Sequence, residues 1–189
     1  MTQVFPTRAK YQDAVMHGAK AFLVPELKAG VAERGPPLGM PKTWNGGFAS
    51  VFRVNSGGKD YAVKCFTMDI GDAATQYAEV SAYLQQNKLS YFAHFAFHKQ
   101  GIRVEGREYP IVQLEWVRGA PLKTFIENNL RDPHRLVALA EAWRRMLSDL
   151  RANHIAHGDL QHENVLVNDD SGGPTLRLID YDTVVVPIS

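Results

Sequence analysis

The sequence predicts an α+β fold in which an antiparallel sheet is followed by a mainly helical part of the chain. Up to Trp116, apolar and polar residues alternate in stretches that glycine-rich turns separate, which is the period of strands. After Gly119 the apolar residues recur at helical spacing instead. The chain has 189 residues, enough to bury a sizeable core in one domain or in two small lobes.

The composition excludes several classes of protein. Lys and Arg number 21 against 20 Asp and Glu, so no net charge attracts nucleic acid or an anionic membrane. The single cysteine, Cys65, excludes an internal disulfide, and residues 1–12 lack the apolar segment of a signal peptide. The sequence has no run of about 18 apolar residues, which a membrane span needs. We expect a cytoplasmic protein without nucleic-acid or membrane partners.

The first 42 residues carry no recognisable chemistry. Tyr11–Ala21 has the pattern of a short helix, and Ala29–Pro41, rich in glycine and proline, is expected to be a loop. We expect this segment to be an extension that packs on the part of the chain that follows it.

A glycine turn lies between Trp44 and Val54. Val51 suits a strand on the far side of this turn, and a second strand, Tyr61–Phe66, carries Lys64. Gly46 and Gly47 let backbone N–H groups approach an anion, because no side chain intervenes. An ordinary hairpin turn is the alternative interpretation.

A helix and several strands are expected to follow. The helix is predicted from Asp72 to Leu89, and its apolar residues share one face, at Ala73, Tyr77, Val80 and Leu84. The segment Tyr91–Trp116 is expected to contain about three antiparallel strands, divided at Gly101, Gly106 and Pro110.

A connector and two helices come next. Leu114–Val117 leaves the sheet with backbone N–H and C=O groups that the edge of an adenine could pair with. Pro121 suits the first turn of a helix that runs to about Leu130. A long amphipathic helix is expected to end at Asn153, with apolar positions at Leu136, Leu139, Ala140, Trp143, Leu147 and Leu150.

The main functional motif lies in residues 157–167. Asp159 precedes Asn164 by one short loop, in the pattern His-x-Asp-x-x-x-x-Asn. In phosphoryl transfer, a catalytic-loop Asp accepts the proton of the attacking hydroxyl, and an Asn one turn later holds Mg²⁺. Two short strands, Val165–Val167 and Leu176–Ile179, joined by a turn at residues 169–173, are expected to bring Asp180 back beside Asn164.

The order of these features resembles the protein kinase superfamily, from about Trp44 to the end of the chain. Four motifs follow one another in the order found in that superfamily: the glycine turn, Ala62-Val63-Lys64, His157-Gly158-Asp159 and Ile179-Asp180-Tyr181-Asp182. The residues of these motifs look most like those of bacterial Ser/Thr-kinase-like proteins. The resemblance implies a bilobal fold, with an extension at 1–43, an antiparallel-sheet N-lobe with one packed helix at 44–117, and an incomplete, mainly helical C-lobe at 118–189.

The resemblance also implies the roles of individual residues, with ATP and Mg²⁺ as cofactors and a protein or small-molecule hydroxyl as acceptor. Asp159 is implied as the catalytic base, assisted by Lys64 and Gln161. The nucleotide contacts are implied at Gly46, Gly47, Val51, Ala62, Lys64, Glu79, Glu115 and Val117, and the metal ligands at Asn164, Asp180 and Asp182. Glu79 is expected to form an ion pair with Lys64, and a solvated Glu79 is the alternative.

The sequence departs from the kinase pattern at several positions. Trp44 and Ala49 stand where kinases usually carry the outer glycines of the phosphate loop. Gly158 replaces the arginine that in many kinases receives a phosphorylated activation loop. Gln161 replaces a lysine and supplies no charge, and Asp182 replaces the glycine of Asp-Phe-Gly.

Other functions stay open at this point. His-Gly-Asp followed by Ile-Asp-x-Asp is equally typical of the aminoglycoside and choline phosphotransferases, which phosphorylate small molecules. A pseudokinase that binds nucleotide or a partner without turnover is a further alternative, and a zinc site at His154, His157 and His162 is the last. Because the chain reaches Ser189 soon after Asp182, we expect either a piece of a longer kinase-like protein or a minimal relative without the segment that holds a peptide substrate.

Overall fold

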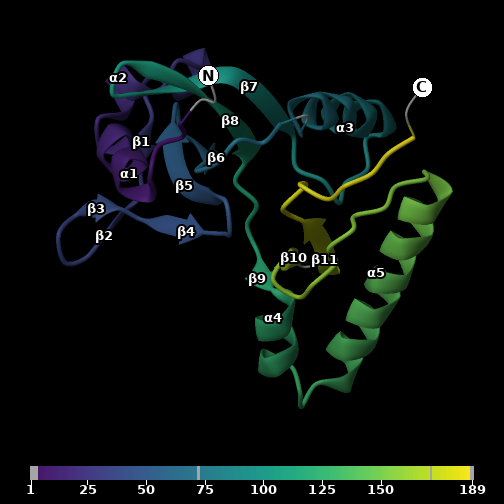
Figure 1. Ribbon diagram of the computed structural model, residues 1–189. Coiled ribbons are helices and arrows are strands. Elements are labelled where there is room, and N and C mark those ends of the chain that lie inside the picture. The colour runs from purple at the N-terminus through teal and green to yellow at the C-terminus, as the bar shows by residue number, and fades with distance from the viewer. Residues whose placement is uncertain (1–3, 72, 171, 188–189) are drawn as a thin grey trace. The chain divides into compact units, whose positions relative to one another are not determined.

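The computed structural model describes residues 4–71, 73–170 and 172–187, and the protein is α+β with antiparallel sheets. Asp72, the expected start of a helix, and Ser171, in an expected turn, lie outside the described residues. The chain divides into two compact units, one of residues 1–75 with 95–116 and the other of residues 76–94 with 117–189 (Figure 1).

The first unit is built on one antiparallel sheet with the strand order β1-β5-β6-β8-β7, and β4 also pairs with β5. Its strands are β1 (Val31–Ala32), β4 (Thr43–Asn45), β5 (Ala49–Ser56), β6 (Lys59–Phe66), β7 (Phe95–Val104) and β8 (Arg107–Glu115). A separate ribbon joins β2 (Arg34–Gly35) to β3 (Met40–Pro41). The segment expected to be a loop, Ala29–Pro41, therefore holds three short strands, because β1 finds a partner in β5 far along the chain.

Two long strands, β7 and β8, replace the three that were expected before Trp116. Gly101 lies inside β7, where the pairing with β8 shifts register between His98 and Ile102. A Cβ atom on Gly101 would come within 2.2 Å of a side-chain carbon of Ile111. This glycine therefore marks a close approach within a strand and not a boundary between strands.

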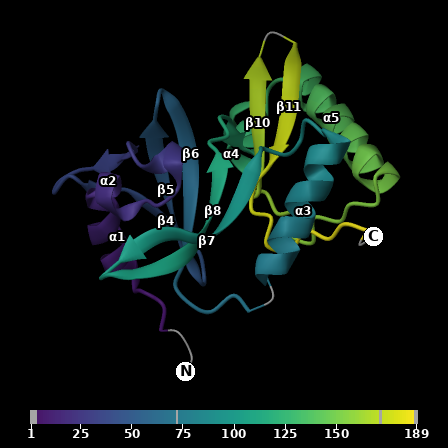
Figure 2. The ribbon, with the colours of Figure 1, turned by 90° about the horizontal axis from the view of Figure 1, so that it is seen from above.

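The N-terminal residues cover one face of this sheet with α1 (Arg8–Met16), α2 (Gly18–Ala21) and a short 3₁₀ turn, η1 (Pro25–Leu27), as Figures 1 and 2 show. Their apolar side chains share one core with the strands, a core that includes Tyr11, Val15, Phe22, Leu27, Phe52, Val54, Val63, Ile102 and Ile111. The hydroxyl of Tyr11 donates to the carbonyl oxygen of Phe66 at 2.7 Å, inside that core. The described part of the predicted extension, from residue 4 to residue 43, thus contributes to the core of the first unit.

The second unit combines helices with a small antiparallel sheet of order β11-β10-β9. It contains most of α3 (Ala73–Asn87), α4 (Leu122–Asn128), α5 (Pro133–Ala152), β9 (Ala120–Pro121), β10 (Val165–Asp170) and β11 (Gly173–Leu178). Strand β11 lies against α5 (Figures 1 and 2). The expected hairpin is present, and Asn153 follows α5 as its C-terminal cap. From Gln76 onward α3 belongs to this unit, so its expected packing on the first sheet stays a prediction.

The buried face of α5 differs from the one the sequence predicted. Leu139 and Leu150 are buried as expected, but Ala142 and Met146 complete the face, while Leu147 is 41% exposed. The helix carries apolar residues around much of its circumference, so sequence spacing alone did not define one face. Among the described residues, no helix combines the length and the hydrophobicity needed to cross a bilayer.

Candidate functional site

The glycine turn joins β4 to β5, and its two glycines face open space. The N–H of Gly46 donates to the carbonyl oxygen of Ala49 at 3.0 Å, which closes the turn. Gly46 and Gly47 are exposed, and a Cβ atom at either would meet no other atom within 4 Å. Neither has a positive φ. Packing and backbone conformation therefore do not demand glycine here, whereas the close approach of a ligand would.

Side chains hold this turn from two directions. The guanidinium of Arg8, at the start of α1, donates from Nη2 to the carbonyl oxygen of Gly46 at 2.6 Å. The hydroxyl of Ser50 donates to Oδ1 of Asn45 at 2.8 Å, which links the two strands that flank the turn. The turn has a defined conformation before any ligand binds.

Three predicted nucleotide-binding residues share one face of the first sheet. Val51 lies opposite Lys64 in the β5–β6 register, and Ala62 lies on the same face as Lys64 because side chains alternate along a strand. The opposite face carries Phe52 and Val63, which are buried in the core with α1. The Nζ atom of Lys64 is 5.8 Å from the ring centre of Phe48, at the tip of the glycine turn.

An aromatic and cationic column that sequence reasoning missed lies on this same face. The rings of Trp44 and Trp116 are 5.1 Å apart between centres. Lys42 lies 4.8 Å from the ring centre of Trp44, and Arg53 lies 4.9 Å from that of Trp116. Asp60 accepts a hydrogen bond from Arg53 at 2.5 Å. The pairings of β4 with β5, of β5 with β6 and of β6 with β8 bring these residues together, and spacing in the sequence does not disclose them.

The predicted adenine connector crosses from one unit to the other. Glu115 ends β8 in the first unit and is exposed, while Val117 belongs to the second unit. Between them, the N–H of Trp116 donates to the carbonyl oxygen of Asp60 at 2.9 Å. The predicted pairing of this connector with an adenine stays a prediction.

In the second unit, the predicted catalytic residues form a hydrogen-bonded group around Asp159. The side-chain amide of Asn164 donates to the carboxylate of Asp159 at 2.8 Å and to its carbonyl oxygen at 3.0 Å. The side-chain amide of Gln161 donates to the same carboxylate at 3.1 Å. Asn164 is buried and Asp159 is partly exposed, so the carboxylate is oriented and still accessible.

The end of β11 carries Asp180 to this group. The N–H of Ile179 donates to the carbonyl oxygen of Asn164 at 2.9 Å, so Asp180 follows directly beyond a contact with the loop. Asp180 is exposed and has a φ of +63°. Such a conformation is uncommon for a residue with a side chain and is found more often at functional sites. The β10–β11 hairpin therefore brings Asp180 back to the loop that carries Asn164, as the sequence predicted.

Asp182 has a partner that the sequence did not reveal. Its carboxylate accepts a hydrogen bond from the hydroxyl of Tyr77 on α3, and its carbonyl oxygen accepts one from the side chain of Gln76 at 3.4 Å. Burial, and then the charge of Asp182, raise the pKa of the Tyr77 hydroxyl above its usual range. Asp182 thus connects α3 to the segment after Asp180. Its role as a metal ligand stays a prediction.

Glu79, the expected partner of Lys64, is exposed on α3 and forms no hydrogen bond or ion pair with any described residue of its own unit. Lys64 and Glu79 belong to different units, so the expected ion pair between them stays a prediction.

The loop that carries Asp159 is closely packed on its other side. Gly158 has a φ of +76°, and a Cβ atom there would meet the carbonyl oxygen of Thr183 at 2.5 Å. The hydroxyl of Thr183 donates to the carbonyl oxygen of His157 at 2.8 Å. A side chain at position 158 has no room here, which explains the glycine.

The donor set decides which metals suit the second unit. Among the residues that the structure describes, no three His, Cys, Asp or Glu side chains gather to hold a metal ion, so the zinc alternative at His154, His157 and His162 is wrong. The Nδ2 atom of Asn164 is engaged by Asp159, so its Oδ1 atom is the one left for a cation. With the carboxylate of Asp180 it offers two hard oxygens, a donor set that suits Mg²⁺, which keeps several waters and phosphate oxygens.

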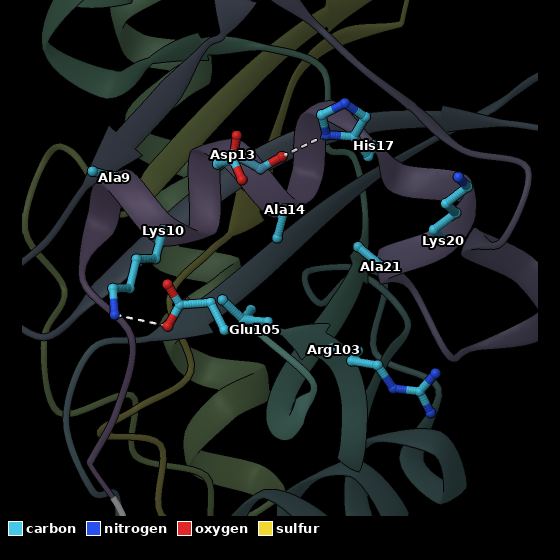
Figure 3. Close-up of a pocket in the computed structure, with 10 residues that line it drawn as sticks. Ala9, Lys10, Asp13, Ala14, His17, Lys20, Ala21, Arg103 and Glu105 are labelled. Atoms are coloured by element: carbon cyan, nitrogen blue, oxygen red, sulfur yellow. Dashed lines mark hydrogen bonds and ion pairs between the residues drawn. The ribbon is translucent and has the colours of Figure 1, made fainter.

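A separate hollow of about 450 Å³ lies in the first unit, lined by α1, α2 and residues 103–105 (Figure 3). Lys10 and Glu105 form an ion pair of 2.7 Å at its edge. None of the predicted site residues lines this hollow, and its rim mixes cations with anions, so it does not select one class of ligand.

Comparisons of the chain with known protein families and with curated proteins find no match.

Proposed function

We propose that this protein is an ATP- and Mg²⁺-dependent phosphotransferase with a protein-kinase-like bilobal fold, which transfers the terminal phosphoryl group of ATP to a hydroxyl. The observation that carries the proposal is the Asp159 carboxylate, held by Asn164 at 2.8 Å and by Gln161 at 3.1 Å. An oriented, accessible carboxylate beside an amide oxygen and a second carboxylate is what a catalytic base with neighbouring metal ligands requires.

The reaction assigns one role to Asp159. The acceptor hydroxyl oxygen attacks the γ-phosphorus of ATP, and the bond from that phosphorus to the β,γ-bridging oxygen breaks. ADP leaves with the electron pair of the broken bond, and the proton of the hydroxyl passes to the carboxylate of Asp159. The amides of Asn164 and Gln161 hold that carboxylate in position for the proton.

The remaining predicted residues are proposed to bind the nucleotide and its metal. Gly46 and Gly47 offer backbone N–H groups to the phosphates, and Lys64 supplies a positive charge. Val51 and Ala62, on the same face as Lys64, offer apolar contact to the base, and the connector from Glu115 to Val117 offers backbone groups to its edge. Asn164 and Asp180, with Asp182 as a further candidate, would hold Mg²⁺, which neutralises charge on the phosphates.

The test measures phosphoryl transfer from labelled ATP to three acceptors: a Ser/Thr-rich protein, an aminoglycoside and choline. We expect transfer to at least one acceptor and a loss of about a hundredfold or more in Asp159→Ala, because general bases contribute this much. ATP affinity measured by calorimetry should persist in that variant, since the base acts on the acceptor. Glu163→Ala, an exposed carboxylate of the same loop, is the matched control and should transfer normally.

The acceptor that is labelled separates the candidate functions. Labelled protein favours a protein kinase, and a labelled aminoglycoside or choline favours a small-molecule phosphotransferase. ATP binding without transfer to any acceptor favours a pseudokinase. Transfer that persists unchanged in Asp159→Ala would contradict the role of Asp159.

A further inference from the structure

The peptide that joins Gly46 to Gly47 is fixed by a residue outside the predicted site. Arg8, in the first turn of α1, donates from Nη2 to the carbonyl oxygen of Gly46 at 2.6 Å, across 38 positions of sequence. The arginine is exposed and forms no ion pair with any described residue. Its hydrogen bond to the glycine turn is therefore its one defined contact in the described part of the chain.

Helix α1, which begins at Arg8, is anchored in the first unit by several contacts. Tyr11 and Val15 are buried in the core of the first unit, and the hydroxyl of Tyr11 is bonded to the carbonyl oxygen of Phe66. The side chain of Gln12 donates to the carbonyl oxygen of Pro41 at 3.1 Å, in the segment that leads to β4. Because α1 is held at several points, the bond from Arg8 limits the movement of the turn.

The orientation of one N–H group follows from this bond. The peptide after Gly46 is trans, and in a planar trans peptide the C=O and N–H bonds point in opposite directions. Arg8 begins α1, and α1 packs on the face of the sheet that carries Phe52. The N–H of Gly47 therefore points to the other side, which is the side of Lys64.

Two further observations agree with this orientation. The N–H of Gly47 donates to no described residue, so it is available to an acceptor. The ring of Phe48, the next residue, lies 5.8 Å from the Nζ atom of Lys64, which places the tip of the turn over the Lys64 face. The strand that enters the turn is itself held by the tilted contact between the rings of Trp44 and Trp116.

We propose that Arg8 is a positioning residue, which orients the N–H of Gly47 toward a phosphate of the bound nucleotide. By this assignment α1 contributes to the nucleotide site as well as to the fold. The inference rests on the proposed function, because it presumes that a nucleotide binds at the glycine turn.

The experiment compares MgATP with adenosine, which has the same base and ribose but no phosphate. Calorimetry on the full chain would give both dissociation constants for the wild type, Arg8→Ala, Arg8→Lys and Lys10→Ala. We expect Arg8→Ala to weaken the binding of MgATP roughly 3- to 10-fold, the size of one ordinary hydrogen bond, and to leave the binding of adenosine unchanged. The MgATP affinity of Arg8→Lys should lie between those of the wild type and Arg8→Ala, because lysine keeps the positive charge but lacks the guanidinium.

Lys10→Ala is the matched control, because it removes a cation from the same helix whose partner is Glu105 and not the turn. Its MgATP affinity should equal that of the wild type. The inference is overturned if Arg8→Ala binds MgATP within twofold of the wild type, or if it loses MgATP and adenosine equally. A wild-type chain that binds adenosine and MgATP with equal affinity also overturns it, since the phosphates then contribute nothing. A wild-type chain that binds neither ligand overturns the proposed function itself, and the inference with it.

Discussion

His157 is a buried polar residue whose ring has no hydrogen-bond partner among the described residues. Its side chain is 2% exposed. Burial lowers the pKa of the imidazole, while the backbone of Ile179 and the charges of Asp180 and Asp159 oppose that effect more weakly. The folded state therefore favours the neutral ring, because a charged imidazole would lose its hydration with only partial compensation.

The lowered pKa of His157 predicts a pH-dependent stability. An unfolded histidine titrates near pH 6.5, so below about that pH the unfolded chain binds a proton that the folded chain refuses. The free energy of unfolding should thus fall between about pH 6.5 and the lower pKa of the folded state. His157→Leu, which keeps a side chain of similar size, should reduce this fall, as measured by urea unfolding at pH 7.5 and 5.5.

The control for this prediction is His134→Leu, which changes an exposed histidine on α5 and should keep the wild-type fall in stability. An equal fall in the wild type and in His157→Leu would show that other groups cause the pH dependence.

Helix α3 is the element whose side chains hold the segment after β11 in place. The side chain of Gln76 donates to the carbonyl oxygen of Val184 at 3.2 Å, and the hydroxyl of Tyr77 donates to the carboxylate of Asp182. One turn and a half later, the hydroxyl of Tyr83 donates to the carbonyl oxygen of Asn153 at 2.9 Å. Within the second unit, α3 therefore positions both the segment that follows Asp180 and the end of α5.

These two tyrosines give a matched pair of substitutions. Tyr77→Phe removes a hydrogen bond to a charged acceptor and should lower the free energy of unfolding by about 1.5–3 kcal/mol, whereas Tyr83→Phe removes one to a neutral carbonyl and should cost about 0.5–1.5 kcal/mol. Urea unfolding at pH 7 measures both. A larger loss in Tyr83→Phe than in Tyr77→Phe would mean that the contact with Asp182 does not stabilise the unit.

At the scale of the whole molecule, local features of the sequence predicted individual strands and hairpins. Contacts between residues far apart in the sequence determined the strand pairing that was not predicted. β5, β6 and the β10–β11 hairpin were predicted because alternation and turn residues lie within a few positions of each other. Asp159 and Asn164 were identified as one motif for the same reason. The pairing of β1 with β5 was not predicted, because Val31 and Asn55 lie far apart along the chain.

In the candidate site, too, contacts between residues far apart in the sequence were not predicted. The bond from Tyr77 to Asp182 joins residues 105 positions apart, and the bond from Arg8 to Gly46 joins residues 38 apart. No spacing rule links such positions, since tertiary packing alone determines which side chains meet. Sequence reasoning therefore identified the candidate catalytic and binding residues and missed most of those that hold them in place.

Nucleotide binding, as proposed, depends on the positive charge of Lys64 and on Mg²⁺ held by Asn164 and Asp180. MgATP at a hundred times its dissociation constant should stabilise the folded state by about 2.7 kcal/mol, which a thermal shift would detect. Lys64→Ala should remove most of that shift by deleting the phosphate contact. Lys59→Ala, an exposed lysine at the start of the same strand, should leave it intact. The affinity for ATP should also fall in excess chelator, and an unchanged affinity would contradict the assigned metal ligands.

The close contact of Gly158 with Thr183 also limits how this chain could evolve. An arginine at position 158 would need both an unfavourable positive φ and space that the carbonyl oxygen of Thr183 occupies. Reciprocal backbone bonds between Ala156 and Val185, at 2.7 and 3.0 Å, hold that segment against the loop. A mutational path to any larger residue at position 158 would therefore have to loosen residues 183–185 first.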